Sequence, residues 1–151
     1  MAQEHLGVRE HGKNRGPHVD IFLRSAGLDP TRGAYPWCAA FVNYCFQVAA
    51  TDTGATNRHP KTASVAKLWA KAPPHARTMT PAEGAIFVML RPDGKGHTGI
   101  IESVFVDEKG VGMTTIEGNT DASGGREGDG VYRKIRRPSE CKGFVNYSLL
   151  R

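Results

Sequence analysis

Apolar residues recur at helical spacing through the first half of the chain. The pattern predicts a short helix over residues 2–9 and a longer one over residues 17–26, whose apolar positions follow i, i+3, i+4 spacing behind a proline in the first turn. A helix is also predicted over residues 37–50, and because it is apolar nearly all round, we expect it to be buried. The last predicted helix, over residues 62–71, ends at a pair of prolines.

The second half of the chain has the pattern of β-strands. Residues 84–90 form a short apolar run bounded by turn residues, which predicts a central strand. Further strands are predicted over residues 97–106, 111–117, 130–136 and 143–149, joined by Asp-Gly, Lys-Gly and Gly-Gly turn signals. We expect these strands to form an antiparallel meander of five to six strands. Because helices precede strands instead of alternating with them, the fold class is predicted to be α+β.

Composition limits the class of protein further. A chain of 151 residues with 39% hydrophobic content fits one domain with a single core, over residues 1–151. No apolar stretch approaches the roughly 18 residues of a membrane span, and the first residues lack the pattern of an export signal. The three cysteines match no disulfide framework, so we expect reduced thiols and synthesis in a reducing cytoplasm.

The net charge of +5 predicts attraction to polyanions such as nucleic acid, anionic lipid or an anionic bacterial wall. The one local basic cluster, residues 133–137, alternates like the exposed face of a strand, and we interpret it as solvated charge. Aromatic residues are not interleaved with it, which disfavours nucleic-acid binding. We therefore expect no nucleic-acid or membrane partner, and a monomer.

Four polar residues stand where a cysteine hydrolase needs its catalytic groups. Cys38 is at the start of the buried helix, where free backbone N–H groups and the helix dipole favour the thiolate. His97 begins a strand and is flanked by glycines that permit close approach. Glu117 and Asn119 end the next strand, and the strand period of two would aim both side chains at one site. Amide hydrolysis by cysteine requires a thiolate, an imidazole and a group that orients it.

Simpler interpretations apply to most other candidates. Cys45 is interpreted as a small buried hydrophobe and Cys141 as an incidental free thiol, while Asn119 would also fit a turn. Residues 94–99 satisfy G-x-G-x-x-G, but a strand follows them and not the helix that a dinucleotide site requires. The remaining histidines match no zinc spacing and are interpreted as surface residues: His5, His11, His18, His59 and His75.

Three motifs in this order, Gly33–Val42, Gly96–Glu102 and Ile116–Thr120, resemble the CHAP domain. This is the cysteine- and histidine-dependent amidohydrolase/peptidase domain of bacterial and phage peptidoglycan hydrolases. The resemblance implies a papain-like fold, with N-terminal helices packed on the antiparallel sheet. It also implies that Cys38 attacks the substrate and that His97 acts as the base.

By the same resemblance, Glu117 would orient the imidazole and Asn119 would be a further polar residue of the catalytic set. Tyr35 and Trp37 are candidates to line the substrate groove, although packing is an equal alternative for Trp37. Some relatives bind calcium in the loop before the cysteine, but here that loop offers only Asp29. A hard dication needs more oxygen ligands than this, so we expect no metal and no cofactor.

Three functions remain open at this point. The first is a bacteriolytic, endolysin-like peptidoglycan hydrolase, either an N-acetylmuramoyl-L-alanine amidase or a stem-peptide or cross-bridge endopeptidase. The second is a papain-like cysteine protease or transferase on a non-wall substrate, and the third a non-catalytic basic module that binds wall or nucleic acid. A wall hydrolase without an export signal would reach its substrate through phage- or secretion-system-type delivery. A delivery partner and an immunity partner are both left open.

Overall fold

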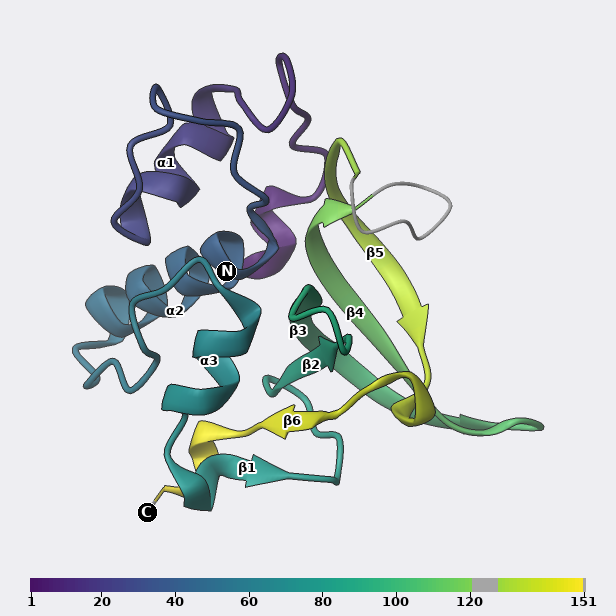
Figure 1. The fold of residues 1–151 in the computed structure, drawn as a ribbon. Helices are drawn as coiled ribbons and strands as arrows, with labels where there is room; N and C mark the ends of the chain where they lie inside the picture. Colours follow the sequence, from purple (N-terminus) through teal and green to yellow (C-terminus); the bar gives the residue numbers. More distant parts are fainter. Residues whose placement is uncertain (121–127, 151) are drawn as a thin grey trace.

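Three helices and a six-stranded antiparallel sheet make up the fold, which Figure 1 shows in a computed structural model describing residues 1–120 and 128–150. Helices α1 (Pro17–Ser25), α2 (Cys38–Thr53) and α3 (Val65–Lys71) gather on one side of the sheet. The predicted α+β class is confirmed, and the arrangement is consistent with a papain-like fold. Within the described ranges, no helix has both the length and the apolar character needed to span a bilayer.

The strand order is β1-β6-β2-β3-β4-β5. The strands are β1 (Arg77–Thr78), β2 (Ile86–Leu90), β3 (Gly96–Asp107), β4 (Gly110–Thr120), β5 (Gly130–Arg136) and β6 (Gly143–Val145). Strands β2 to β5 form the predicted meander. The last strand, β6, does not pair with β5 but crosses back to lie between β1 and β2. The prediction of a continuous meander is therefore wrong for the last strand. Burial explains the return, because Phe144 and Val145 become fully buried there.

Several predicted boundaries shift for local reasons. Residues 2–9 contain only a 3-10 turn, η1 (Ala2–His5), and the end of the predicted last strand is the 3-10 turn η4 (Tyr147–Leu149). Helix α3 begins later than predicted because Ser64 caps it, accepting a hydrogen bond from the Lys67 backbone N–H at 3.2 Å. Two further 3-10 turns are η2 (Pro74–Ala76) and η3 (Pro138–Glu140).

The first turn of α2 lies against β4, and Gly118 makes this approach feasible. A Cβ atom at Gly118 would lie 2.7 Å from Trp37 Cζ3 and 2.8 Å from Phe41 Cβ, closer than packed carbon atoms can come. Trp37 and Phe41 are themselves fully buried. The missing side chain thus lets the beginning of the helix, which carries Cys38, dock directly onto the strand that carries Glu117.

The surface interpretation of the histidines is correct for three of them and wrong for two. His11, His18 and His75 are exposed. His59 is buried, stacks on Phe46 and has Nδ1 3.1 Å from the Tyr147 hydroxyl, and burial lowers its pKa to about 4. The ring of His5 packs edge-on against three aromatic rings: Phe22, Phe41 and Tyr44. A polar sequence context cannot reveal such packing, because the imidazole ring also has apolar faces.

Candidate active site

Cys38 is the first residue of α2, and its side chain is almost completely buried. At this position it lies beside the backbone N–H groups of the first helical turn, at the positive end of the helix dipole. The preceding Trp37 is fully buried, stacks on Phe22 and donates from Nε1 to Glu10 Oε1 at 2.7 Å. Trp37 therefore packs in the core and does not line an open groove, whereas Tyr35 remains half-buried at the surface.

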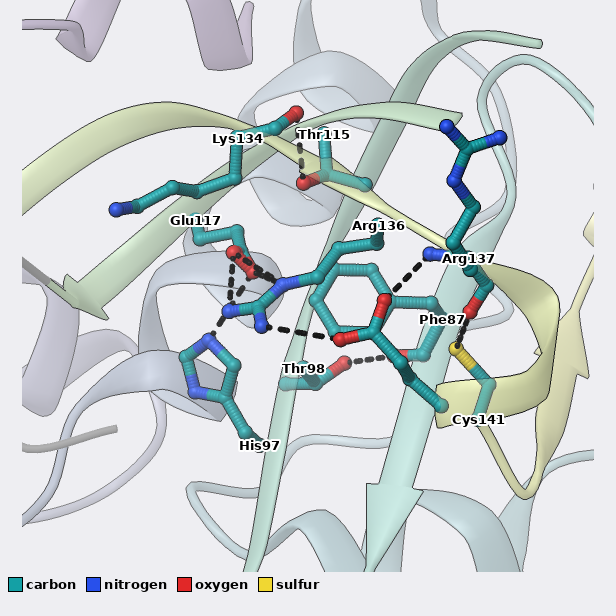
Figure 2. Close-up of polar contacts among 10 residues, drawn as sticks. Phe87, His97, Thr98, Thr115, Glu117, Lys134, Arg136, Arg137 and Cys141 are labelled. Atoms are coloured by element: carbon teal, nitrogen blue, oxygen red, sulfur yellow. Dashed lines mark hydrogen bonds and ion pairs between the residues drawn. The ribbon is translucent and has the colours of Figure 1, made fainter. Parts of the chain in front are cut away.

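The imidazole of His97, near the start of β3, is buried between Cys38 and Glu117. Its Nε2 lies 3.3 Å from Glu117 Oε1, and Figure 2 shows the ring pointing at that carboxylate. Burial lowers the pKa of His97, but hydrogen bonding and charge from Cys38 and Glu117 outweigh it and raise the pKa to about 9. At neutral pH the imidazole is thus a cation next to the thiol, which makes it a proton donor.

Glu117 is fully buried, yet its carboxylate stays ionised because Arg136 also binds it. Burial alone would raise the pKa of Glu117, but His97 and Arg136 together hold it below its ordinary value. The Arg136 guanidinium donates from Nε at 2.8 and 3.2 Å and from Nη2 at 3.0 Å to the two carboxylate oxygens. Figure 2 shows His97 and Arg136 both directed at this one carboxylate. The geometry fixes the carboxylate in a single orientation.

Gly99 provides the space through which Glu117 reaches His97. A Cβ atom at Gly99 would lie 2.9 Å from Glu117 Cγ and 2.8 Å from the Ile116 carbonyl oxygen. A side chain at this position would therefore occupy the path of the glutamate. The glycine that follows His97 in the second motif thus has a direct steric role in the site.

Arg136 was missed from the sequence, where it belongs to the cluster interpreted as solvated charge. That interpretation is wrong for Arg136, which is 8% exposed, and it holds for Arg133, which is exposed. The register explains the difference, because Arg136 pairs with the buried Met113 of β4 and shares its face. The sequence alone does not give this register, because it depends on the pairing of β5 with β4.

Asn119 lies just beyond the regular part of β4. The pairing of β4 with β5 is irregular between Glu117 and Thr120, and Asn119 has a left-handed backbone φ of 55°. Simple alternation therefore does not relate its side chain to that of Glu117. Asn119 is buried, lines a small pocket with Pro36, Glu10 and other polar residues, and its Oδ1 makes no hydrogen bond to the described part of the chain.

The other two cysteines differ from Cys38 in their environment. All three cysteines are free. Burial raises the pKa of Cys45 to about 12, and burial likewise raises the pKa of Cys141 to about 12. Both are therefore poor nucleophiles at neutral pH, since the thiolate is the reactive form. These thiols fit the simpler interpretations given to them above.

Nothing in the described ranges gathers three or more His, Cys, Asp or Glu side chains in a way that could hold a metal ion. Asp29, the single acid of the loop before the cysteine, accepts hydrogen bonds from the backbone and hydroxyl of Thr31 at 2.9 and 2.6 Å. The Asp29 carboxylate thus stabilises the turn by accepting these two hydrogen bonds. The absence of a calcium site stays a prediction.

The raised pKa of His97 predicts a stability that falls as pH rises. Below about pH 6.5 the imidazole is protonated in both the folded and unfolded chain, so its contribution is fully present. Between pH 6.5 and about 9 only the folded chain keeps the proton, and the contribution is lost through this window. Urea unfolding of wild type and His97→Gln across this range should show a slope that the variant lacks. Equal slopes would contradict the assignment.

A helix-start cysteine beside a buried imidazole–carboxylate pair, in an α+β fold, is the arrangement of the papain-like class. A family model of the CHAP domain matches residues 30–119, more than half of the chain. The protein therefore belongs to the CHAP domain family. A search of curated proteins gave no match, and a search of solved structures gave none either. CHAP domains are generally hydrolases, amidases or peptidases with peptidoglycan as substrate.

Proposed function

We propose that this protein is a peptidoglycan hydrolase that cleaves an amide bond of the cell-wall peptide through an acyl-enzyme on Cys38. The bond is that of an N-acetylmuramoyl-L-alanine amidase or of a stem-peptide or cross-bridge endopeptidase. The observation that carries the proposal is the buried chain of Cys38, His97 and Glu117 within a CHAP domain. Action at the bacterial wall, after delivery by a phage particle or a secretion machine, is part of the proposal.

The first chemical step is attack of the Cys38 thiolate on the amide carbonyl carbon. The new S–C bond forms as the carbonyl π pair moves onto oxygen, where the backbone N–H of Cys38 and one further donor would stabilise it. His97 then gives its proton to the leaving nitrogen, and the C–N bond breaks to release an amine. The cationic state of His97 at neutral pH supports this role as acid.

The second step returns the enzyme to its starting state. The imidazole, now neutral, takes a proton from water as the water oxygen attacks the thioester carbonyl. The C–S bond breaks, the carboxylic acid leaves and the thiolate–imidazolium pair is restored. Glu117 stabilises the cation in both steps, and Arg136 keeps the carboxylate in place for it.

The proposal is tested by incubating purified sacculi with wild type, Cys38→Ala and the matched control Cys45→Ala. Wild type and Cys45→Ala are expected to release soluble fragments, whereas Cys38→Ala releases none. Mass spectrometry of the fragments distinguishes the amidase from the endopeptidase, because each leaves a different new amino terminus. Cleavage of unrelated peptide substrates without release from any wall type would overturn the proposal in favour of a protease of another specificity.

A further inference from the structure

Three lysines line a groove whose wall includes Pro36, two residues before Cys38 in the chain. The groove has a volume of about 380 Å³, and Tyr35 and Pro36, which precede Cys38 closely in the chain, form part of its wall. We call it the lysine groove after its charged residues: Lys61, Lys67 and Lys71. All three are exposed. Lys67 and Lys71 are one helical turn apart on α3, so both ammonium groups can address the same ligand.

The charge of the groove has a single sign. Its other lining residues are neutral, and they include the apolar Ala26, Leu28 and Ala63. In the part of the chain that the structure describes, none of the three lysines has an ion-pair partner. Unpaired cations around a partly apolar floor are complementary to a peptide that carries carboxylates.

We propose that the lysine groove binds the carboxylate-bearing part of the peptidoglycan stem peptide and thereby sets the direction in which the substrate lies across Cys38. This inference rests on the proposed function. Cys38 belongs to one core cluster with Val65 and Leu68 of α3, the helix that carries Lys67 and Lys71, so a substrate that reaches Cys38 can extend into the groove. A free phosphate polymer has no such continuity. The peptide carboxylates are therefore the anions that the site selects.

The pocket on the other side of Pro36 supports this direction. It contains Asn119 and Lys13 but also the carboxylate of Glu10, so its charge is mixed. An anionic segment would gain less there, since Glu10 opposes the attraction of Lys13. The single-sign groove is the better place for the carboxylates, and the other part of the substrate then extends toward Asn119.

The expected size of the effect follows from the exposure of the lysines. Because each ammonium group is hydrated and screened by salt, loss of one lysine should weaken substrate binding by about twofold to fivefold. Loss of all three together should weaken it by about tenfold or more, and the difference should shrink at high ionic strength. The chemical step itself should be unaffected, because the lysines do not touch the reacting atoms.

The test measures binding separately from catalysis. In the Cys38→Ala background, Kd is measured for two synthetic stem peptides, one with free carboxylates and one with the same carboxylates converted to amides. Lys61→Gln, Lys67→Gln, Lys71→Gln and the triple variant are compared with Lys109→Gln, a matched control in the exposed β3–β4 turn. We expect the triple variant to raise Kd for the acidic peptide about tenfold and leave Kd for the amidated peptide unchanged.

Two results would overturn the inference. One is an equal change of Kd for both peptides, which would indicate a steric role; the other is no change beyond that of Lys109→Gln. In the cleaving enzyme, the triple variant should raise KM and leave kcat as it is. Failure of wild type to cleave any wall would defeat the proposed function, whereas the Kd comparison would still decide whether the groove selects carboxylates.

Discussion

Replacing Arg136 with methionine is expected to lower the free energy of unfolding by on the order of 3–5 kcal/mol. The substitution removes the guanidinium that donates three hydrogen bonds to Glu117 and leaves a fully buried carboxylate with only His97 beside it. Among the described residues, His97 is then the one remaining cation beside the buried carboxylate, and removal of one partner from a buried ion pair is among the most costly single substitutions. Hydrolysis should also fall, because the carboxylate that orients His97 is no longer fixed.

The measurement is chemical denaturation at pH 7, with Arg133→Met as the matched control. Arg133 is on the same strand and forms an ion pair of 2.7 Å with Glu102, but this pair is exposed. Its loss should cost little stability, because both charged groups of an exposed pair are hydrated and screened by salt. Combining Arg136→Met with Glu117→Gln removes both charges and should recover part of the stability but none of the activity. Equal costs at positions 136 and 133 would contradict the role assigned to the buried pair.

Substituting Gly118 with alanine is expected to lower the hydrolysis rate about 100-fold. The added Cβ would lie 2.7 Å from the Trp37 ring and 2.8 Å from Phe41, so the start of α2 must move away from β4. Overpacking of this kind costs about 1–3 kcal/mol of stability. The larger effect is on activity, because the displaced turn carries Cys38, and a shift of about 1 Å is enough to lose the attack geometry.

Gly112→Ala provides the comparison. Gly112 lies in the β3–β4 hairpin, near its turn, and an added Cβ would meet the Phe105 ring and the Arg137 guanidinium. It should reduce stability while the folded fraction keeps full activity. Rates are therefore measured per folded molecule, from circular dichroism and active-site titration on the same samples. Should Gly118→Ala retain the wild-type rate per folded molecule, the close approach of α2 to β4 is not what positions Cys38.

The local pattern predicted most of the elements but not every partner. Periodicity located α1 and α2 within one to three residues, and turn signals located β2 to β5. The pairing of β6 with β2 could not be predicted. An apolar run such as residues 143–145 indicates a strand but does not indicate which strands pair with it. Only the burial of Phe144 in the three-dimensional core decides that.

The candidate site was predictable where chemistry and position agree. Cys38 at a helix start, His97 beside glycines and Glu117 at a strand end combine residue type with location, and the structure brings these three together. Arg136 could not be recognised in this way, because in the sequence it is one basic residue among several in the same cluster. Its importance arises from a register that pairs β5 with β4, which is a long-range property.

The strand order also determines when the protein can become reactive during its synthesis. Strand β6 lies between β1 and β2, so the six-stranded sheet cannot be completed before residue 145 has been synthesised. Arg136 must arrive before Glu117 can be buried as an anion. A chain that has completed only α2 has Cys38 without the side chains of His97 and Glu117, which lie on the later strands β3 and β4. Formation of α2 alone therefore does not assemble the site, which also requires the pairing of β3 with β4 and of β4 with β5.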